Sequence, residues 1–342
     1  KLIATMMPAM MLIMNFTLIA IIWFGSIRID NGSMQVGSLM AFIQYAMMIM
    51  ISLLIVSMMF IMVPRASASA IRINEVLETI PGITDPGEFK EPGNPRGLLE
   101  FKDVTFSFPG AEQPAINQVS FKASPGEITA IIGGTGSGKS ALINLIPRFY
   151  DVDQGCVLID GVDVREMSQE RLRAKIGLVP QKTVLFTGTI ADNIRYGKDN
   201  ASEGEVHHAA EVAQAIEFVD SMPDGFNSII EQGGTNVSGG QKQRLAIARA
   251  LVRKPDIYIF DDSFSALDFK TDARLRSALR QETVNSTVLI VAQRVSTVMD
   301  ADQIIVLDDG NLVGQGKHKE LIKDNKVYRE IVLSQLSEEE LA

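Results

Sequence analysis

One short segment combines four glycines with a lysine and a hydroxyl group in a spacing suited to phosphate. It follows the apolar run 127–132 and consists of Gly133, Gly134, Thr135, Gly136, Ser137, Gly138, Lys139 and Ser140. Glycines let the backbone wrap closely around phosphates with its N–H groups pointing inward, and the helix expected after the loop adds a positive dipole. We expect Lys139 to reach the β- and γ-phosphates of a nucleotide and the Ser140 hydroxyl to ligate Mg²⁺.

A pair of carboxylates follows another apolar run. Residues 256–261 are predicted to form a buried strand, and Asp261 lies at its end, directly before Asp262. Ligands of open α/β sheets bind at the carboxyl ends of the strands. Asp261 is therefore the expected second protein ligand of Mg²⁺, as in other P-loop nucleotide hydrolases.

These side chains need an α/β scaffold, and the chain from Leu98 onward has the pattern for one. Short β-rich runs alternate with amphipathic helical stretches, which is typical of a partly parallel sheet. Asp160-Gly161 and Asp309-Gly310 have the composition of hairpin turns. Strands are predicted at 99–106, 127–132, 156–159, 176–179, 256–261, 287–292 and 303–308.

The first 80 residues differ from the rest of the chain. Residues 2–27 and 31–64 carry no charge, and each stretch exceeds the about 20 apolar residues that cross a bilayer. We predict transmembrane helices at about 2–27 and 34–64 with a cytoplasmic helical extension, so that residues 1–80 form a membrane segment. The alternative is a pair of buried helices in a soluble core, in which uncharged runs of this length are unusual.

Four prolines and four glycines between 81 and 97 indicate a linker, which leaves 98–342 for a nucleotide-binding domain. The predicted fold class is thus an α/β P-loop NTPase domain preceded by an all-α transmembrane hairpin. Because the chain opens at Lys1 and not at a methionine, we expect it to be the C-terminal part of a longer protein.

Composition excludes several other classes. The formal net charge is −9, with 32 basic and 41 acidic side chains, so a basic surface for nucleic acid is not indicated. The single cysteine, Cys156, cannot form an internal disulfide, and three dispersed histidines give no zinc site.

A further motif narrows the class. Ser238, Gly239, Gly240 and Gln241 precede the apolar helix LAIARAL, about 100 residues after the phosphate loop and 20 residues before the end of the Asp261 strand. Ser238 is a suitable N-cap, and the paired glycines expose the N-terminal amides of the helix. Placed between those two motifs, the segment resembles the signature of ABC ATPases. The resemblance extends over the whole chain, whose two apolar spans look like the last two of the six helices of an ABC exporter half-transporter.

This resemblance implies roles for further residues. Phe108 matches the aromatic residue that stacks on the adenine of ATP, and Gln181 matches the glutamine that serves both Mg²⁺ and catalysis. Glu231 matches the acidic residue of an exporter loop, and Ser265 to Asp268 match the D-loop. Ala141, directly after the phosphate loop, is expected to contact ATP together with the loop residues. In the family, two nucleotide domains pair head to tail, so Ser238 to Gln241 would complete the partner's ATP site.

Two positions depart from the family pattern. Asp262 stands where glutamate usually polarises the attacking water, and its side chain is one methylene shorter. A general base must come within about 2.6–3.2 Å of its proton donor, directly or through one water. Gln293 stands where histidine is usual, and glutamine cannot become cationic. A chain with both changes resembles the degenerate subunit of a heterodimeric exporter. The alternative is an active variant.

We therefore expect one subunit of an ATP-driven exporter of hydrophobic drugs or lipids, using ATP and Mg²⁺ and pairing with a second, non-identical half-transporter. It would be a multi-pass protein of the plasma membrane, in contact with membrane lipid, with a cytoplasmic nucleotide-binding domain. Thirteen of the sixteen methionines lie in the first 64 residues, where some could contact an apolar or amphipathic substrate. The alternatives are a competent homodimeric exporter and a mainly regulatory ATP-binding subunit. The two charge-free spans disfavour a soluble ABC ATPase. An importer is disfavoured because membrane and ATPase parts are joined in one chain.

Overall fold

A computed structural model describes residues 2–91 and 96–335 of the chain. It divides into two compact units, Lys1–Gly82 and Ile83–Ala342. The part of the predicted linker at 92–95 and the end of the predicted nucleotide-binding domain at 336–342 lie outside the described residues.

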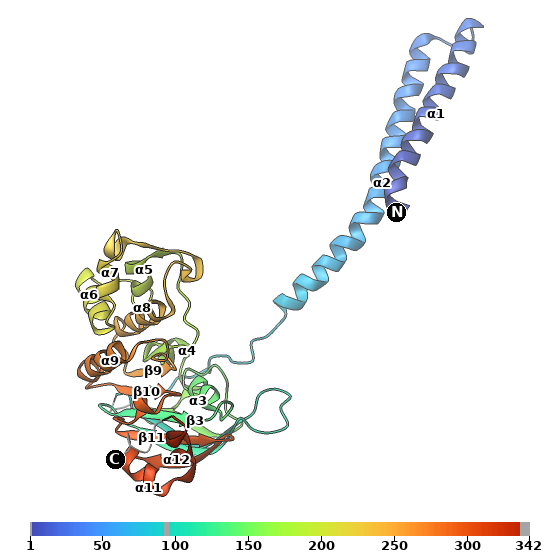
Figure 1. The fold of residues 1–342 in the computed structure, drawn as a ribbon. Helices are drawn as coiled ribbons and strands as arrows, with labels where there is room; N and C mark the ends of the chain where they lie inside the picture. The colour runs from blue at the N-terminus through green and yellow to red at the C-terminus, as the bar shows by residue number, and fades with distance from the viewer. Residues whose placement is uncertain (1, 92–95, 336–342) are drawn as a thin grey trace. The chain divides into compact units, whose positions relative to one another are not determined.

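The first unit consists of two long helices, α1 (Leu2–Asp30) and α2 (Val36–Leu77) (Figure 1). Both are long and apolar enough to cross a membrane. Their approach is close at Gly25, where an added Cβ would lie 2.3 Å from Leu39 Cδ1. The side chains of α2 are exposed or half-exposed within this chain, so its apolar surface needs lipid or further helices to cover it.

The helix ends differ somewhat from the prediction. The predicted spans leave residues 28–33 between them for the turn, but α1 continues to Asp30 and the turn follows, with Ser33 N–H donating to the Arg28 carbonyl at 2.9 Å. The predicted span 34–64 and its extension form one helix of 42 residues that contains Pro64. At 1.5 Å per residue this helix is about 60 Å long, roughly twice the thickness of the hydrocarbon core.

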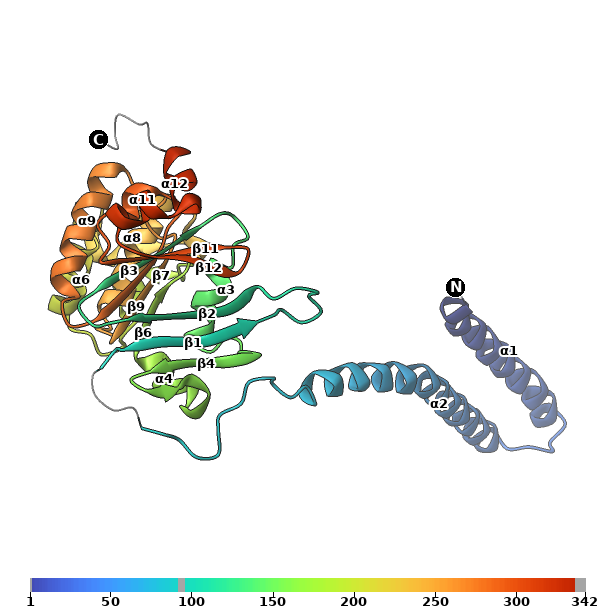
Figure 2. The ribbon, with the colours of Figure 1, turned by 90° about the horizontal axis from the view of Figure 1, so that it is seen from below.

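The second unit is an α/β domain built on two main sheets (Figure 2). A six-stranded sheet has the order β12-β11-β3-β10-β9-β6 and is parallel except for its edge strand β12. A four-stranded antiparallel sheet has the order β2-β1-β4-β5, and a two-stranded ribbon pairs β7 with β8. The strands are β1 (Leu99–Phe106), β2 (Ile116–Ala123), β3 (Ile128–Gly133), β4 (Gln154–Ile159), β5 (Val162–Asp163), β6 (Ile176–Val179), β7 (Gly188–Thr189), β8 (Ile229–Ile230), β9 (Ile257–Asp261), β10 (Thr287–Val291), β11 (Gln303–Asp308) and β12 (Asn311–Gly316).

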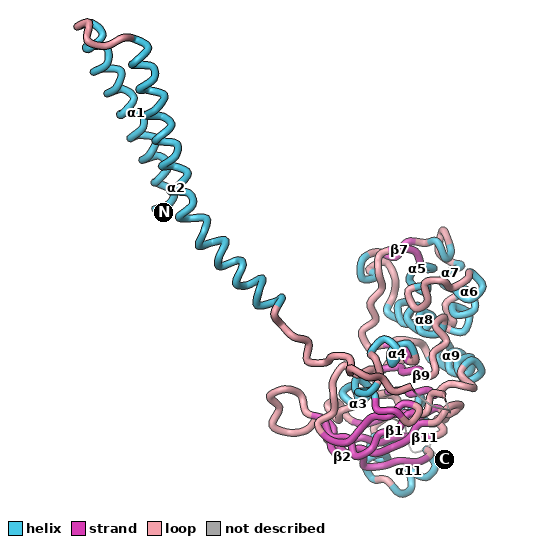
Figure 3. Tube along the Cα trace, turned by 180° about the vertical axis from the view of Figure 1, so that it is seen from behind, coloured by secondary structure: helices cyan, strands magenta, loops and turns pink. Residues whose placement is uncertain are grey.

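Helices fill the connections between these strands (Figure 3). The α-helices are α3 (Lys139–Leu145), α4 (Gln169–Ala174), α5 (Ile190–Arg195), α6 (Glu203–Val212), α7 (Ile216–Asp220), α8 (Gly239–Leu251), α9 (Phe269–Glu282), α10 (Val295–Val298), α11 (His318–Asp324) and α12 (Lys326–Leu333). Short 3-10 turns lie at η1 (Val164–Glu166), η2 (Gly225–Asn227) and η3 (Gln232–Gly234).

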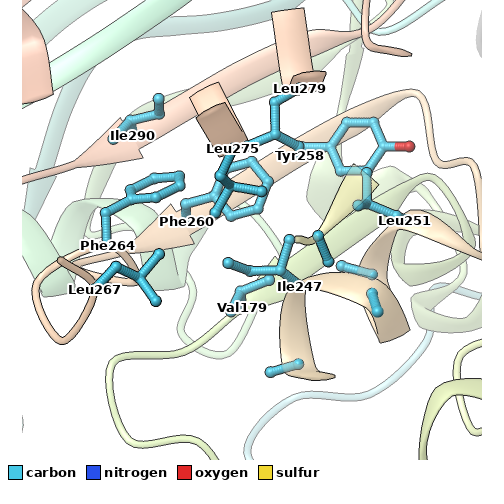
Figure 4. Packing of buried hydrophobic residues seen from close by; sticks show 14 of the residues in the cluster. Val179, Ile247, Leu251, Tyr258, Phe260, Phe264, Leu267, Leu275, Leu279 and Ile290 are labelled. Atoms are coloured by element: carbon cyan, nitrogen blue, oxygen red, sulfur yellow. The ribbon is translucent and has the colours of Figure 1, made fainter. Parts of the chain in front are cut away.

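The central sheet separates two hydrophobic cores because alternate side chains of each strand point to opposite faces. On β9, Ile257 and Ile259 join the core shared with the antiparallel sheet. Tyr258 and Phe260 point the other way and pack against residues of α8 and α9 (Figure 4). Their rings stack with centroids 6.2 Å apart, and Phe264 extends the aromatic cluster toward the end of the strand. Packing on both faces therefore fixes the strand that ends at Asp261.

The predicted strands are all present, within two residues at each end. Both predicted hairpin turns are confirmed, since Asp160 and Asp309 have positive φ and each precedes a glycine with positive φ. Strand β2 was not predicted. Two consecutive polar residues, Asn117 and Gln118, interrupt its alternation, and there Gln118 has φ +47° and the pairing with β1 is irregular.

The described part of the predicted linker is fastened to the domain. The Asp85 carboxylate accepts hydrogen bonds from the backbone N–H of Gln169 at 3.0 Å and from its side-chain amide at 3.1 Å. These bonds lower the pKa of the Asp85 carboxyl group. Lys90 pairs with Glu166 at 2.6 Å, so residues 83–91 run along η1 and the start of α4.

Candidate nucleotide-binding site

The phosphate loop joins the end of β3 to the start of α3. Gly138 has φ +96°, and an added Cβ would lie 2.5 Å from the Ala115 carbonyl oxygen. Gly133 is equally constrained, since its Cβ would lie 2.2 Å from the Leu307 carbonyl oxygen. The neighbouring strand and loop thus leave no room for side chains at these two positions, so only glycine fits this path of the backbone.

Lys139 folds back over this loop. Its Nζ donates to the carbonyl oxygens of Gly133 at 2.8 Å and Gly134 at 2.6 Å. Burial lowers the pKa of Lys139, and the carboxylates of Asp261 and Asp262 act in the opposite direction. The ammonium group therefore lies against carbonyl oxygens of its own loop, and anionic phosphate oxygens would stabilise its charge.

A cavity of about 350 Å³ opens beside the loop, and most of the predicted site lines it. Its lining residues are Phe108, Ala115, Thr135, Gly136, Gly138, Lys139, Ser140, Ala141, Gln181, Asp261, Asp262, Val291 and Gln293. The structure thus brings together the predicted aromatic residue, part of the loop, both carboxylates and both glutamines, whereas Gly133, Gly134 and Ser137 of the loop do not line the cavity. Ala115 and Val291 were not predicted, because nothing in their residue types marks them.

Phe108 forms one wall of the cavity and is 41% exposed. Two aromatic rings hold it edge to face: Phe106 with centroids 5.0 Å apart, and Tyr150 with centroids 5.4 Å apart. Such T-shaped pairs restrict the orientation of a ring. The exposed part of Phe108 is therefore a pre-oriented surface on which a flat base could stack.

The carboxylate of Asp261 lies in a poorly solvated position. Burial raises the pKa of its carboxyl group, Asp262 adds to this effect, and Lys139 opposes it. A divalent cation at this position would favour the charged form. With the Ser140 hydroxyl and the Gln181 amide, Asp261 supplies the oxygen ligands that Mg²⁺ prefers.

Within residues 2–91 and 96–335, no group of three or more His, Cys, Asp or Glu side chains could hold a metal ion. Mg²⁺ retains waters and takes phosphate oxygens in addition to one or two protein ligands. The Ser140 hydroxyl, the Gln181 amide and the Asp261 carboxylate, which all line the cavity, fit a metal that binds in this way together with a nucleotide.

Asp262 occupies a strained and well-anchored position. Its φ is +46°, a conformation that Asp and Asn tolerate better than most residues. Its N–H donates to the Val291 carbonyl at 2.9 Å, and the Ser265 hydroxyl donates to the Asp262 carbonyl at 2.8 Å. The side chain is 3.4 Å from Gln181 Nε2, so the carboxylate faces the cavity.

The signature segment lies outside this cavity. Ser238 caps α8 through a reciprocal capping box: its hydroxyl accepts from Gln241 N–H at 3.3 Å, and Gln241 Oε1 accepts from Ser238 N–H at 2.8 Å. An added Cβ at Gly240 would lie 3.0 Å from the Ala266 carbonyl oxygen. The start of α8 therefore packs closely on the loop that follows Asp262, while Gly239 and its neighbours leave the helix N-terminus accessible.

Comparisons with known proteins agree with this geometry. A family model described as "ABC transporter" matches residues 116–265. An uncharacterised ABC transporter ATP-binding protein of Mycobacterium tuberculosis is 48% identical over 336 residues, which are 97% of this chain and 57% of that protein. An ATP-dependent lipid A-core flippase of Desulfotalea psychrophila is 38% identical over 322 residues, 94% of this chain and 56% of the flippase.

A solved structure of a bacterial Atm1-family ABC exporter with ATP bound has a TM-score of 0.84 and 34% sequence identity. The alignment covers 96% of this chain and 58% of the exporter chain. The chain therefore spans somewhat more than half the length of each of these three relatives.

Proposed function

Because the nucleotide-binding part of this chain is an ABC transporter ATPase domain, we propose that the chain is a subunit of an ATP-driven membrane exporter. The observation that carries the proposal is the single cavity that Phe108, Lys139 and Asp261 share. It offers a stacking surface for a base, a cation for phosphates and a carboxylate for a metal. The two long apolar helices before the domain supply the membrane part.

ATP would bind with its adenine on Phe108 and its phosphates along the loop from Gly133 to Ser140. Mg²⁺ would be held by Ser140, Gln181 and Asp261 and would neutralise charge on the phosphates during hydrolysis. Lys139 would donate to phosphate oxygens in place of the loop carbonyls that it contacts now. The pKa directions of Lys139 and Asp261 support this arrangement, since both charged groups lack full solvation.

Hydrolysis at this chain's own site would be slow. Asp262 is the candidate general base, but its side chain is short and its backbone is held by hydrogen bonds to Val291 and Ser265. Gln293 lines the cavity and can donate a hydrogen bond, but it has no cationic form. We propose that the site binds Mg-ATP firmly and turns it over weakly.

The signature residues Ser238 to Gln241 would act on the ATP of a second, non-identical half-transporter. They do not line this chain's cavity, and their capped helix start offers N–H groups to an anion. The partner would supply the glutamate and histidine that this chain lacks, so hydrolysis would occur mainly at the partner's site. Closure of the paired domains around ATP would then change the access of the membrane helices.

The exported substrate would be hydrophobic or amphipathic, as a lipid is. One relative is named as a lipid A-core flippase, and the apolar spans of this chain have no charged residue between 2 and 27 or between 31 and 64. Transporters of small ions usually need intramembrane charges. The protein would lie in the plasma membrane in contact with lipid, with residues 98–342 in the cytoplasm.

The deciding experiment measures ATP turnover by the complete transporter chain purified without a second kind of subunit. The parent is compared with the Asp262→Glu/Gln293→His double variant, using preparations that bind ATP and self-associate. We expect an almost inert parent and a clear gain in the double variant. Ordinary turnover by the parent would instead favour a competent homodimeric exporter, and an inert double variant that still binds ATP would favour a regulatory subunit.

A further inference from the structure

Gln335 fastens the short segment between β10 and α10 with both ends of its side-chain amide. Its Nε2 donates to the Gln293 carbonyl at 2.7 Å, and its Oε1 accepts from the Val295 N–H at 2.9 Å. A carbonyl needs a donor and an N–H needs an acceptor, so the two bonds fix the orientation of the amide. The Val295 N–H lies in the first turn of a helix, where the helix itself offers no acceptor.

Gln335 lies two residues beyond the end of α12, and its N–H donates to the Val332 carbonyl at 3.0 Å. Tyr328 and Val332 of that helix are fully buried. The Tyr328 hydroxyl is hydrogen-bonded to His318 Nδ1 at 2.7 Å, and Asn325 caps the helix by accepting from Tyr328 N–H at 2.7 Å. The helix that precedes Gln335 is therefore anchored independently of the nucleotide site.

Residues 293–295, which Gln335 holds, connect the nucleotide cavity with the loop that follows Asp262. Gln293 lines the nucleotide cavity. The next residue, Arg294, donates to the carbonyl oxygens of Ser265 at 2.7 Å and Leu267 at 3.5 Å. A shift of this backbone would therefore move the Gln293 side chain and loosen Arg294 from that loop at the same time.

We propose that Gln335 is a positioning residue for Gln293. The amide holds the backbone of residues 293–295, and Gln293 can then meet the terminal phosphate of a nucleotide without first ordering its own segment. Pre-ordering of this kind raises the affinity for the phosphate that Gln293 contacts and leaves the rest of the nucleotide unaffected. The inference rests on the proposed function, because it assumes that this cavity binds ATP.

The two hydrogen bonds can be separated by substitution. Gln335→Leu removes both bonds at similar side-chain size. Gln335→Glu keeps an acceptor for the Val295 N–H but places a carboxylate oxygen against the Gln293 carbonyl. Gln303→Leu is the matched control, because Gln303 also donates from its side chain to a backbone carbonyl, that of Lys122 at 3.1 Å, and does not line the cavity.

The experiment uses the complete transporter and measures two quantities. Amide hydrogen exchange of the peptide spanning 292–298, measured without nucleotide, reports the two hydrogen bonds of the Gln335 amide, which we call the clamp. Equilibrium binding of Mg-ATP and Mg-ADP reports the contact with the terminal phosphate. We expect faster exchange at Val295 in Gln335→Leu and not in Gln335→Glu. In both variants the preference for ATP over ADP should fall about two- to tenfold, the size of one net hydrogen bond, with ADP affinity unchanged. Gln303→Leu should match the parent.

Three results would overturn the proposal. Equal weakening of ATP and ADP would show a general structural role for Gln335. Parental exchange and parental preference in Gln335→Leu would show that the clamp has no effect, and a parent that binds both nucleotides equally would show that Gln293 does not sense the terminal phosphate. If the parent binds neither nucleotide, the proposed function itself is refuted, and the role of the clamp is refuted with it.

Discussion

The side-chain amide of Gln181 lies 3.4 Å from the carboxylate of Asp262, and both residues line the cavity beside the phosphate loop. The two come from different strands of the central sheet, since Gln181 follows β6 and Asp262 follows β9. The strands are direct neighbours, which brings their carboxyl ends to one edge. The contact therefore follows from sheet order, and it keeps the short side chain of Asp262 directed into the cavity.

This contact leads to a prediction for Asp262→Glu. The longer side chain extends the carboxylate by about 1.5 Å toward the position of an attacking water. We expect turnover to rise at this site, toward the about 10²- to 10⁴-fold that a well-placed general base contributes. The measurement is phosphate release at saturating Mg-ATP, with Asp308→Glu on the exposed end of β11 as the control. Unchanged turnover in a variant that still binds ATP would show that reach does not limit Asp262.

Lys139→Ala tests the phosphate loop. The substitution removes a cation whose present partners are carbonyl oxygens of its own loop. We expect the dissociation constant for Mg-ATP to rise about 10- to 150-fold, the effect of losing a charge-assisted hydrogen bond. Calorimetric titration provides the measurement, and Lys102→Ala on the exposed side of β1 provides the control. Hydrolysis at a partner's site should be partly retained, and complete loss of all nucleotide binding would contradict the asymmetric arrangement.

Much of this site could be predicted from local sequence. The glycine spacing of the loop, the carboxylate after a buried apolar run and the Ser238 cap each depend on neighbouring residues, and local patterns carry that information. Gln335 and Arg294 could not be found in this way. Their partners are backbone atoms of segments 42 and 29 residues away, and a lone glutamine or arginine does not indicate which carbonyl it will reach.

The same distinction applies to the fold. Strands with apolar residues on both faces, such as β9 and β10, are evident from their composition. Strand β2 presents polar side chains between its buried ones, and β12 is an edge strand of mainly exposed and half-exposed residues. Both are defined by the strands with which they pair, so tertiary context decides their structure.

Ser238→Ala separates stability from signalling to a partner's site. The reciprocal capping box of α8, between Ser238 and Gln241, has a serine-based counterpart at the start of α6, between Ser202 and Glu205. Ser238→Ala and Ser202→Ala should each lower the free energy of unfolding by about 0.5–2 kcal/mol. Only Ser238→Ala should reduce ATP turnover of the assembled transporter. Thermal melting and phosphate release on both variants check this, and equal turnover in the two would remove the signature role.

The contact between His318 and Tyr328 predicts a dependence of stability on pH. Burial lowers the pKa of His318, while Asp300 raises it and Lys319 lowers it. Burial likewise raises the pKa of Tyr328 to about 12, so the phenol is neutral. Since the pKa of His318 is lower in the folded state than its ordinary value of about 6.5, only the unfolded state takes up a proton as the pH first falls below that value.

The contribution of His318 to stability is therefore complete above about pH 6.5 and declines as the pH falls toward the lower folded pKa. We expect His318→Gln to flatten the fall of the unfolding midpoint between pH 7.5 and about pH 5.5. Thermal unfolding of the complete chain at a series of pH values provides the measurement. An identical slope in the parent and the variant would show that another group causes the dependence.

Phe108→Ala tests whether the aromatic wall binds a base. Stacking of a base on an aromatic side chain contributes about 1–3 kcal/mol, so the dissociation constant for ATP should rise about 5- to 150-fold. Binding of inorganic triphosphate should be unchanged, because it uses only the loop. Phe149→Ala is the matched control: its ring is 45% exposed, against 41% for Phe108, but it contacts Arg173 and does not line the cavity. Tyr150→Phe, which keeps the ring against Phe108, should retain parental ATP affinity. Equal losses of affinity for ATP and for triphosphate in Phe108→Ala would show that Phe108 stabilises the phosphate loop and does not stack on the base.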